Sequence, residues 1–326
     1  MGISHYIKEI GRGKDGARPL SREQAADLMG QVLDGEVTDL EVGAFCLAMR
    51  IKGETSQEMA GFLDAVRQRL SRVPASAIRP TVVLPSYNGA RRLPVLAPLL
   101  AQRLVEGGLR VVIHGVREDP GRTTTAQVLA AMGIPPLERV ADVRNDVVNF
   151  LPIEMLSPAL NRLLEVRRVV GLRNPAHSLV KLLNPCESRA LVIGSYTHPE
   201  YLRSMTATYI EIGADALLSR GIEGESVADA RRLQQTDAFI AGRPFRVQEA
   251  ETGSIATLPD WPSDIAPDRI AAYIADVLAG RREQPAPITR QIGLVHCAVQ
   301  AMTSGSSPGP GAAPDSAAGS RPAPCR

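Results

Sequence analysis

The same helix-start signal occurs three times within the first sixty residues of the chain. Each copy reads S/T-x-x-E/Q, a capping box in which side chains and backbone satisfy the free amide groups of a new helix. The three boxes are at residues 21–24, 38–41 and 55–58. Gly35 and Gly53 stand where the first two helices would end, and apolar residues recur at helical spacing after each box. The sequence therefore predicts a small N-terminal helical domain, over residues 1–75.

From about residue 80 the hydrophobic pattern changes to short apolar runs separated by helical stretches. The apolar runs are at residues 81–84, 110–113, 191–193 and 216–218. The helical stretches are near residues 94–107, 123–132, 158–170 and 198–212. Short strands that alternate with helices are typical of an α/β fold with a mainly parallel sheet. We therefore expect a larger α/β domain over residues 76–302.

The last part of the chain has a third kind of composition. Residues 303–326 are dominated by Pro, Gly, Ala and Ser, and such a segment buries too little apolar surface to offset its ordering entropy. We expect it to be a disordered tail. No apolar run approaches the roughly 18 residues that a membrane-spanning helix needs, and the N-terminus lacks the apolar segment of a secretion signal. The expectation is a cytoplasmic protein with no membrane association.

Arginine makes up most of the basic residues, although the formal net charge is only +2. The chain has four lysines, so 33 of its 37 basic residues are arginines. The planar guanidinium suits phosphate, but a GC-rich genome gives the same excess, and the positions of the arginines are more informative than their number. The four cysteines lie far apart and the five histidines form no metal-binding motif. We therefore expect neither a bound metal nor a cofactor.

Three segments carry a resemblance to a known family. They are LDGEVTDLEVGAFCLAMRIKGETSQEMAGFLDAVR at 33–67, VVIHGVREDPGRTTTAQVLAAMGI at 111–134 and VRRVVGLRNPAHSLVKLLNP at 166–185. Together they resemble glycosyltransferase family 3, which contains anthranilate phosphoribosyltransferase and pyrimidine nucleoside phosphorylases, over roughly residues 4–303. The resemblance implies the phosphoribosyltransferase type of fold, in which a small helical domain precedes a larger α/β domain.

The family's substrate-binding motifs are altered in this chain. Where the family has a glycine-rich GTGGD turn for pyrophosphate, the chain has PSYNGA at 85–90. Pro85 has no amide to donate, and Tyr87 fills space that the substrate would use. The family's NIST segment becomes VLAP at 95–98, and its KHGN motif keeps only the His-Gly pair at 114–115.

The carboxylates that bind magnesium in the family also look displaced. The alignment puts Ser226 and Val227 where the family has an Asp-Glu pair, although Glu223 or Glu225 would take that place if the loop shifts. Without metal ligands and pyrophosphate donors, ordinary phosphoribosyl transfer loses its positioning and its charge neutralisation. We therefore predict no catalytic residues.

The replacements themselves resemble one branch of the family. The segments PSYNGARR, HGVREDPGRTTTAQVL, RNPAHSLVKLLNP, SYTHPEY and RGIEGE occur in this order, and they resemble the YbiB-type branch, which is described as binding DNA and lacking the transferase activity. The resemblance implies a homodimer formed through the helical domain and a positively charged groove between the domains. The expected partner is DNA, with RNA or single strands as alternatives.

The predicted nucleic-acid site consists of the cations around the altered cleft and its polar neighbours. A cleft that has lost carboxylates and gained cations attracts a phosphodiester backbone through counterion release, with little sequence preference. Tyr87 and His177 are candidates for stacking on bases. The remaining candidates are Arg91, Arg92, Arg122, Lys181, Arg117, Arg220, Asn88, Arg12 and Lys14.

Several of these candidates also have a structural interpretation. Arg117 and Arg122 bracket Glu118 and Asp119, so local ion pairs compete with phosphate binding. Arg12 and Lys14 belong to a glycine-rich loop that is either a mobile basic arm or a solvated linker. Arg167 and Arg173 occupy positions that the family uses near its acceptor, as retained scaffold or as function. These assignments stay open in the sequence.

Three functions fit these observations. The first is non-catalytic, largely sequence-independent binding of nucleic acid by a homodimer. The second is a phosphoribosyl or pentosyl transferase with an atypical substrate and no magnesium pair, and it rests on fold analogy alone. The third is a scaffold with no ligand in the groove.

Overall fold

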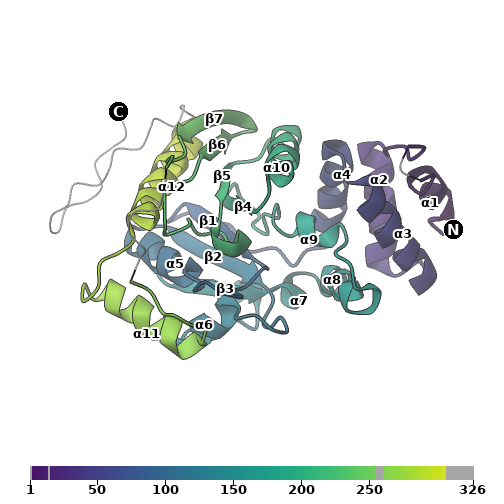
Figure 1. The fold of residues 1–326 in the computed structure, drawn as a ribbon. Helices are drawn as coiled ribbons and strands as arrows, with labels where there is room; N and C mark the ends of the chain where they lie inside the picture. Colours follow the sequence, from purple (N-terminus) through teal and green to yellow (C-terminus); the bar gives the residue numbers. More distant parts are fainter. Residues whose placement is uncertain (1, 14, 254–259, 306–326) are drawn as a thin grey trace.

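The computed structural model describes residues 2–13, 15–253 and 260–305 (Figure 1). The predicted helical start is confirmed. It consists of α1 (Ser4–Ile10), α2 (Arg22–Asp34), α3 (Asp39–Lys52) and α4 (Ser56–Arg67). All three capping boxes form as predicted, and Gly35 ends α2 in the left-handed conformation with a φ of 75°.

A seven-stranded sheet forms the larger part of the molecule, in the order β3-β2-β1-β4-β5-β6-β7. Its strands are β1 (Thr81–Ser86), β2 (Arg110–Gly115), β3 (Val148–Pro152), β4 (Leu191–Tyr196), β5 (Ala216–Arg220), β6 (Thr236–Ile240) and β7 (Arg243–Gln248). The first five strands in this order run parallel, and β6 and β7 continue the sheet as an antiparallel pair. The predicted mainly parallel sheet is therefore confirmed, with β3 and the β6–β7 pair as additions.

Helices cover both faces of this sheet (Figure 1). The helices that follow α4 are α5 (Ala97–Glu106), α6 (Thr125–Ala131), α7 (Ile153–Leu156), α8 (Pro158–Val170), α9 (Ala176–Leu179), α10 (Pro199–Glu211), α11 (Pro267–Leu278) and α12 (Ala286–Ser304). Of these, α8 packs on α2 and α9 packs on α4. Alternate strand residues face opposite ways: Val82 packs in a core with α5, α6, α11 and α12, whereas Val83 packs in the core that contains α10. Short 3₁₀ turns lie at Val140–Asp142 and Ile222–Gly224.

The helical start and the sheet meet through α9 and α10. Both helices pack on α4, and one buried apolar cluster runs from α2–α4 through α8 and α9 to the α10 face of the sheet. A buried ion pair, Lys52 Nζ to Glu58 Oε2 at 2.6 Å, joins α3 to α4 within the helical start. Glu58 also accepts a hydrogen bond from the Leu20 amide at 2.9 Å. The packing of α9 and α10 on α4 places the helical start beside the cleft.

Two predicted features lie wholly or mostly outside the described residues. They are Lys14 and residues 306–326, which are most of the segment expected to be a disordered tail. Helix α12 continues to Ser304. No helix among the described residues is long and apolar enough to cross a membrane. The division of the chain near residue 75 stays a prediction.

Candidate nucleic-acid interface

The turn after β1 points its backbone amides at two carboxylates of the same chain. Glu225 Oε1 accepts hydrogen bonds from the amides of Asn88 and Gly89 at 2.7 and 2.8 Å. Glu223 accepts from the amides of Arg91 and Arg92 at 2.5 and 3.2 Å. Consecutive amides that converge in this way form an anion-binding concavity. In this chain the carboxylates of Glu223 and Glu225 occupy the concavity.

Both carboxylates come from the loop that follows β5. Glu223 has a φ of 48°, a left-handed backbone conformation that residues other than Gly rarely adopt. Glu225 is only 1% exposed, and its second oxygen accepts a short hydrogen bond from the Ser86 hydroxyl. The loop after β5 is thereby tied to the turn after β1.

These contacts do not fit a magnesium site. Both oxygens of Glu225 are engaged by protein donors, whereas Mg²⁺ requires free carboxylate oxygens in octahedral geometry. Ser226, which the alignment puts at a metal-ligand position, donates to the Pro85 carbonyl instead, and Val227 is buried. Within the described residues, no group of three or more His, Cys, Asp or Glu side chains lies in a metal-binding arrangement.

Three of the predicted binding residues have partners within the protein. Arg122 is 9% exposed in its side chain, donates to the Asn88 carbonyl and pairs with Asp119 at 3.4 Å. Arg117 pairs with Glu154 at 2.7 Å. The Asn88 side chain is buried and donates to the Glu223 carbonyl at 3.0 Å. The ion-pairing interpretation therefore describes Arg122, and Arg117 has a more distant partner than the sequence suggested.

Tyr87 and His114 form a hydrogen-bonded pair in the floor of the cleft. The Tyr87 hydroxyl lies 2.7 Å from His114 Nδ1, and His114 Nε2 lies 3.2 Å from the Leu183 carbonyl. The carbonyl can only accept, which assigns the proton to Nε2 and makes the tyrosine the donor. Burial lowers the pKa of His114 to about 4, so the ring is neutral at pH 7. Tyr87 lines a hollow together with His177.

The remaining cations of the cleft lack such partners. The side chains of Lys181 and Arg173 make no hydrogen bond or ion pair to any residue that the structure describes. Burial lowers the pKa of Lys181 to about 8, an effect that Glu225 opposes and that Arg173 and Arg122 reinforce. The charges of Arg91, Arg122, Arg167, Arg173 and Lys181 influence one another. This group is called the cleft cluster below.

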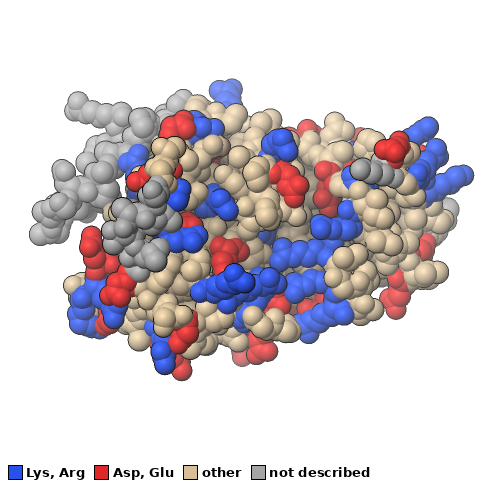
Figure 2. Space-filling model, viewed as in Figure 1, with Lys and Arg blue, Asp and Glu red and all other residues tan. Residues whose placement is uncertain are grey.

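Figure 2 shows basic side chains gathered between the sheet and the helical start. Arg91 and Arg92 are exposed at the end of the β1 turn. Arg167 lies on α8 and has only a 3.4 Å contact to Asp119, which it shares with Arg122. One carboxylate thus faces two guanidinium groups, and the local charge stays positive. The cleft can bind an external anion.

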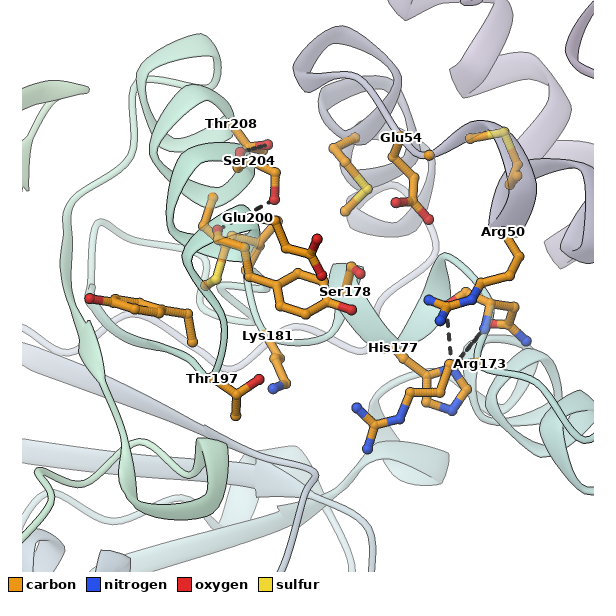
Figure 3. Close-up of a pocket in the computed structure, with 18 of the residues that line it drawn as sticks. Arg50, Glu54, Arg173, His177, Ser178, Lys181, Thr197, Glu200, Ser204 and Thr208 are labelled. Carbon is orange, nitrogen blue, oxygen red and sulfur yellow. Dashed lines mark hydrogen bonds between the residues drawn. The ribbon is translucent and has the colours of Figure 1, made fainter. Parts of the chain in front are cut away.

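A cavity opens beside the cleft cluster, between the α3–α4 turn, α9 and α10 (Figure 3). Its volume is about 210 Å³. The side chains of Arg173, His177 and Lys181 line it on one side, and those of Glu54 and Glu200 on the other. Burial lowers the pKa of His177 to about 4, and Arg173 adds to this effect, so His177 is neutral at pH 7.

Of the two remaining predicted residues, one lies away from this arrangement and the other lies at its edge. Arg12 follows α1, pairs with Glu9 at 2.6 Å, and lies at the outer end of the molecule because α1 packs on α3 (Figure 1). Arg220 is exposed at the end of β5, paired in register with Tyr196. The structure therefore brings Arg91, Arg122, Lys181, Tyr87 and His177 together and leaves Arg12 apart.

Sequence reasoning did not select the residues that the helical start contributes to the cavity. Arg50 and Glu54 stand at the end of α3 and in the turn that follows, and only the packing of α4 on α9 and α10 brings them to the cleft. Glu200 and Tyr201 belong to SYTHPEY, one of the segments in which the chain departs from the transferases. The altered SYTHPEY segment was therefore a signal in the sequence that could have pointed to the α10 side of the cavity.

Known proteins are similar to this chain in both sequence and fold. A family model described as "Glycosyl transferase family, helical bundle domain" matches residues 4–70. The uncharacterised protein YbiB of Escherichia coli K12 is 39% identical over 307 residues, covering 92% of this chain and 94% of YbiB. Anthranilate phosphoribosyltransferase of Anaeromyxobacter dehalogenans is 30% identical over 278 residues, covering 84% and 78%.

Solved structures agree on the fold. Anthranilate phosphoribosyltransferase from Thermus thermophilus superposes with a TM-score of 0.70 at 22% identity, covering 92% of this chain and 89% of that one. The Saccharomyces cerevisiae enzyme in complex with PRPP and Mg gives a TM-score of 0.69 at 14% identity, covering 94% and 89%. The chain belongs to the anthranilate phosphoribosyltransferase-like glycosyltransferase family 3, and among its relatives is the uncharacterised YbiB.

Proposed function

We propose that this protein binds nucleic acid without catalysing a reaction, and that the cleft cluster holds the phosphate backbone. The observation that carries the proposal is the contrast within one cleft. The amides of the β1 turn are satisfied by Glu223 and Glu225, whereas Lys181 and Arg173 have no partner among the described residues. Unpaired, partly buried cations favour a polyanion, since each neutralised phosphate releases a counterion.

DNA is the proposed ligand, with RNA or single strands as further ligands. Phosphate contacts position a strand but carry no sequence information, so the binding is largely sequence-independent. The cytoplasm, where nucleic acid is accessible, is the proposed location. No catalytic role is proposed for any residue.

A phosphoribosyl transferase is the weaker proposal. A pyrophosphate entering the β1 turn would displace two carboxylates that together accept four backbone amides. It would also lack the magnesium that its charge requires. An atypical substrate held by Lys181 and Arg173 is the remaining form of this proposal, and a competition experiment separates the two.

The proposed assembly is a homodimer formed through the helical start. Leu40, Leu47 and Ile51 lie on one face of α3 and are 83%, 45% and 58% exposed. An apolar hollow between α1 and α3, lined by Ile7, Ile10 and Ala44 among others, continues this face. Contiguous exposed apolar surface of this kind marks an interaction site. Two such faces, one from each protomer, would bury each other and leave both clefts open.

The test is fluorescence anisotropy of a labelled 20-nucleotide strand, titrated with protein at low salt. Phosphoribosyl pyrophosphate with Mg²⁺ is the competitor. Binding that saturating competitor leaves unchanged supports the proposal. Saturable binding of the competitor without binding of the strand would favour the transferase, and binding of neither would favour a scaffold.

A further inference from the structure

The cavity beside the cleft cluster has the size of a single ring system. Its volume of about 210 Å³ is below the roughly 300–1,000 Å³ of pockets that enclose drug-sized ligands. The α3–α4 turn, α9 and α10 form its walls, and Lys181 and Arg173 belong to both the cavity and the cleft cluster. A group that enters the cavity therefore stays connected to whatever lies along the cleft.

One wall of the cavity carries a carboxylate, Glu54, that accepts a hydrogen bond from its own backbone amide. Figure 3 shows the Glu54 carboxylate directed from the α3–α4 turn into the cavity, with Glu200 of α10 also at its edge. Within the described part of the chain, no other side chain gives Glu54 a hydrogen bond or an ion pair. Burial raises its pKa. Its own amide, Lys52 and Arg50 oppose this effect. A largely buried carboxylate whose second oxygen has no side-chain donor among the described residues favours a ligand that brings N–H donors.

The other surfaces of the cavity suit a flat, polarisable group. Tyr201 lines it, and Tyr201 lies close enough to Arg173 to affect the pKa of that guanidinium. Met59 and Met205 are buried and also face it. Aromatic rings and thioethers pack well against the face of a heteroaromatic ring. The cavity thus offers a stacking surface, an acceptor and, at its cleft side, two cations.

We propose that the cavity receives one unstacked base of a bound single strand. The phosphates on either side of that base lie on Lys181 and Arg173, and the Glu54 carboxylate accepts hydrogen bonds from the Watson–Crick edge of the base. The inference rests on the proposed function, because the strand's backbone must already occupy the cleft.

Base chemistry gives this cavity a preference. Guanine presents two adjacent N–H donors on its Watson–Crick edge, which match the two oxygens of one carboxylate. Thymine and uracil present a single N–H between two carbonyl oxygens, which repel a carboxylate. The preference is confined to one position of the strand, so it adds to binding that is otherwise indifferent to sequence. Duplex DNA offers no free Watson–Crick edge and gains nothing from the cavity.

The experiment compares three labelled strands that differ only at their centre. They are an all-thymidine 12-mer, the same strand with one central guanosine, and the same strand with one central abasic site. We expect the guanosine strand to bind about tenfold more tightly than the abasic strand, a typical contribution of one stacked base. The thymidine strand should lie between them.

Two variants connect this difference to the cavity. Ser204→Trp fills the cavity from α10, and Ala207→Trp adds the same bulk to an exposed position of α10 outside the cavity. S204W should abolish the difference between the guanosine and abasic strands, and A207W should retain it. Glu54→Gln keeps the size of the side chain but should remove most of the preference for guanosine over thymidine.

The outcomes separate the two proposals. Equal, salt-dependent binding of all three strands by the wild-type protein would overturn the base cavity and leave the proposed function intact. The base cavity is likewise overturned, and the proposed function likewise retained, if S204W and A207W behave alike. If no strand binds at low salt, both proposals fail together.

Discussion

Two neighbouring regions of the cleft present groups that attract anions: the turn after β1, and the segment around α9 that carries Arg173 and Lys181, called the α9 wall below. Only the groups of the turn are neutralised by carboxylates of the protein itself. Four amides of the turn face the carboxylates of Glu223 and Glu225. On the α9 side, the side chain of Lys181 has no hydrogen-bond partner among the described residues, and the opposing charge of Glu225 acts on it only through electrostatics. In this chain the amides of the turn are matched by carboxylates of the protein itself, and the unmatched positive charge lies on the α9 wall.

The largest expected effect concerns the stability that Glu225 gives to the turn after β1. Glu225→Ala leaves the amides of Asn88 and Gly89 without an acceptor in a buried place. Because a buried unsatisfied donor costs roughly 1–3 kcal/mol, we expect the free energy of unfolding to fall by about 3 kcal/mol in urea denaturation.

A matched control uses an exposed carboxylate from the same cleft. Glu118 is exposed, so Glu118→Ala should change the free energy of unfolding by less than about 0.5 kcal/mol. A loss in E225A no larger than that in E118A would mean that the carboxylate does not hold the turn closed.

The two cations of the α9 wall should contribute most of the affinity for nucleic acid. Replacing Arg173 and Lys181 together by Glu reverses two charges in the cleft, and we expect the affinity for a single strand at low salt to fall about a hundredfold, since backbone binding is electrostatic. Anisotropy titration measures this change.

The control for this variant carries the same change in net charge elsewhere. Arg281 and Arg282 pair with Asp276 and Asp260 near the end of α11, away from the helical start (Figure 1). Replacing both by Glu should alter the affinity by less than about threefold if local and not total charge governs binding. Equal losses in the two double variants would contradict the comparison.

The exposed arginines at the end of the turn test whether the two regions act together. The amides of Arg91 and Arg92 are bound by Glu223, but their side chains are exposed. Arg91→Ala with Arg92→Ala should weaken strand binding about tenfold and leave stability unchanged, because two phosphate contacts are lost without loss of packing. Unchanged affinity in the same anisotropy titration would confine the site to the α9 wall.

The pKa of Lys181 supplies the smallest of these effects. A free-state pKa of about 8 means that Lys181 loses its charge as the pH rises through 8, and binding of a phosphate must then be accompanied by proton uptake. Affinity should therefore fall about fivefold between pH 8 and pH 9. Lys181→Arg keeps its charge throughout this range, so its affinity should stay flat. A wild-type protein without pH dependence would show that Lys181 does not contact the strand.

Local signals in the sequence were sufficient for the architecture. Capping boxes at Ser21, Thr38 and Thr55 depend on residues three positions apart, and all three formed. Four predicted apolar runs lie within β1, β2, β4 and β5. The β6–β7 pair was not predicted, because β7 is largely exposed at the sheet edge and lacks a continuous apolar run.

The site was predicted less completely, because it depends on contacts between distant segments. The alignment left the places of Glu223 and Glu225 open, and only the fold of the loop after β5 shows them bound to the turn after β1. The sequence left Arg122 open between phosphate binding and a local ion pair, and its guanidinium donates to the Asn88 carbonyl and pairs with Asp119. Glu54 and Arg50 face the cleft only because α4 packs on α9 and α10.

The central claim is that the unpaired cations of the α9 wall bind a nucleic-acid backbone. The most direct test is the dependence of strand affinity on salt, measured by anisotropy for the wild type and for Arg173→Met with Lys181→Met. Because each neutralised phosphate of a single strand contributes about 0.7 to the log–log slope, the account predicts a steep wild-type slope that becomes shallower by about 1.4 in the double variant. An unchanged slope, or a wild-type protein that binds no strand at low salt, would contradict it.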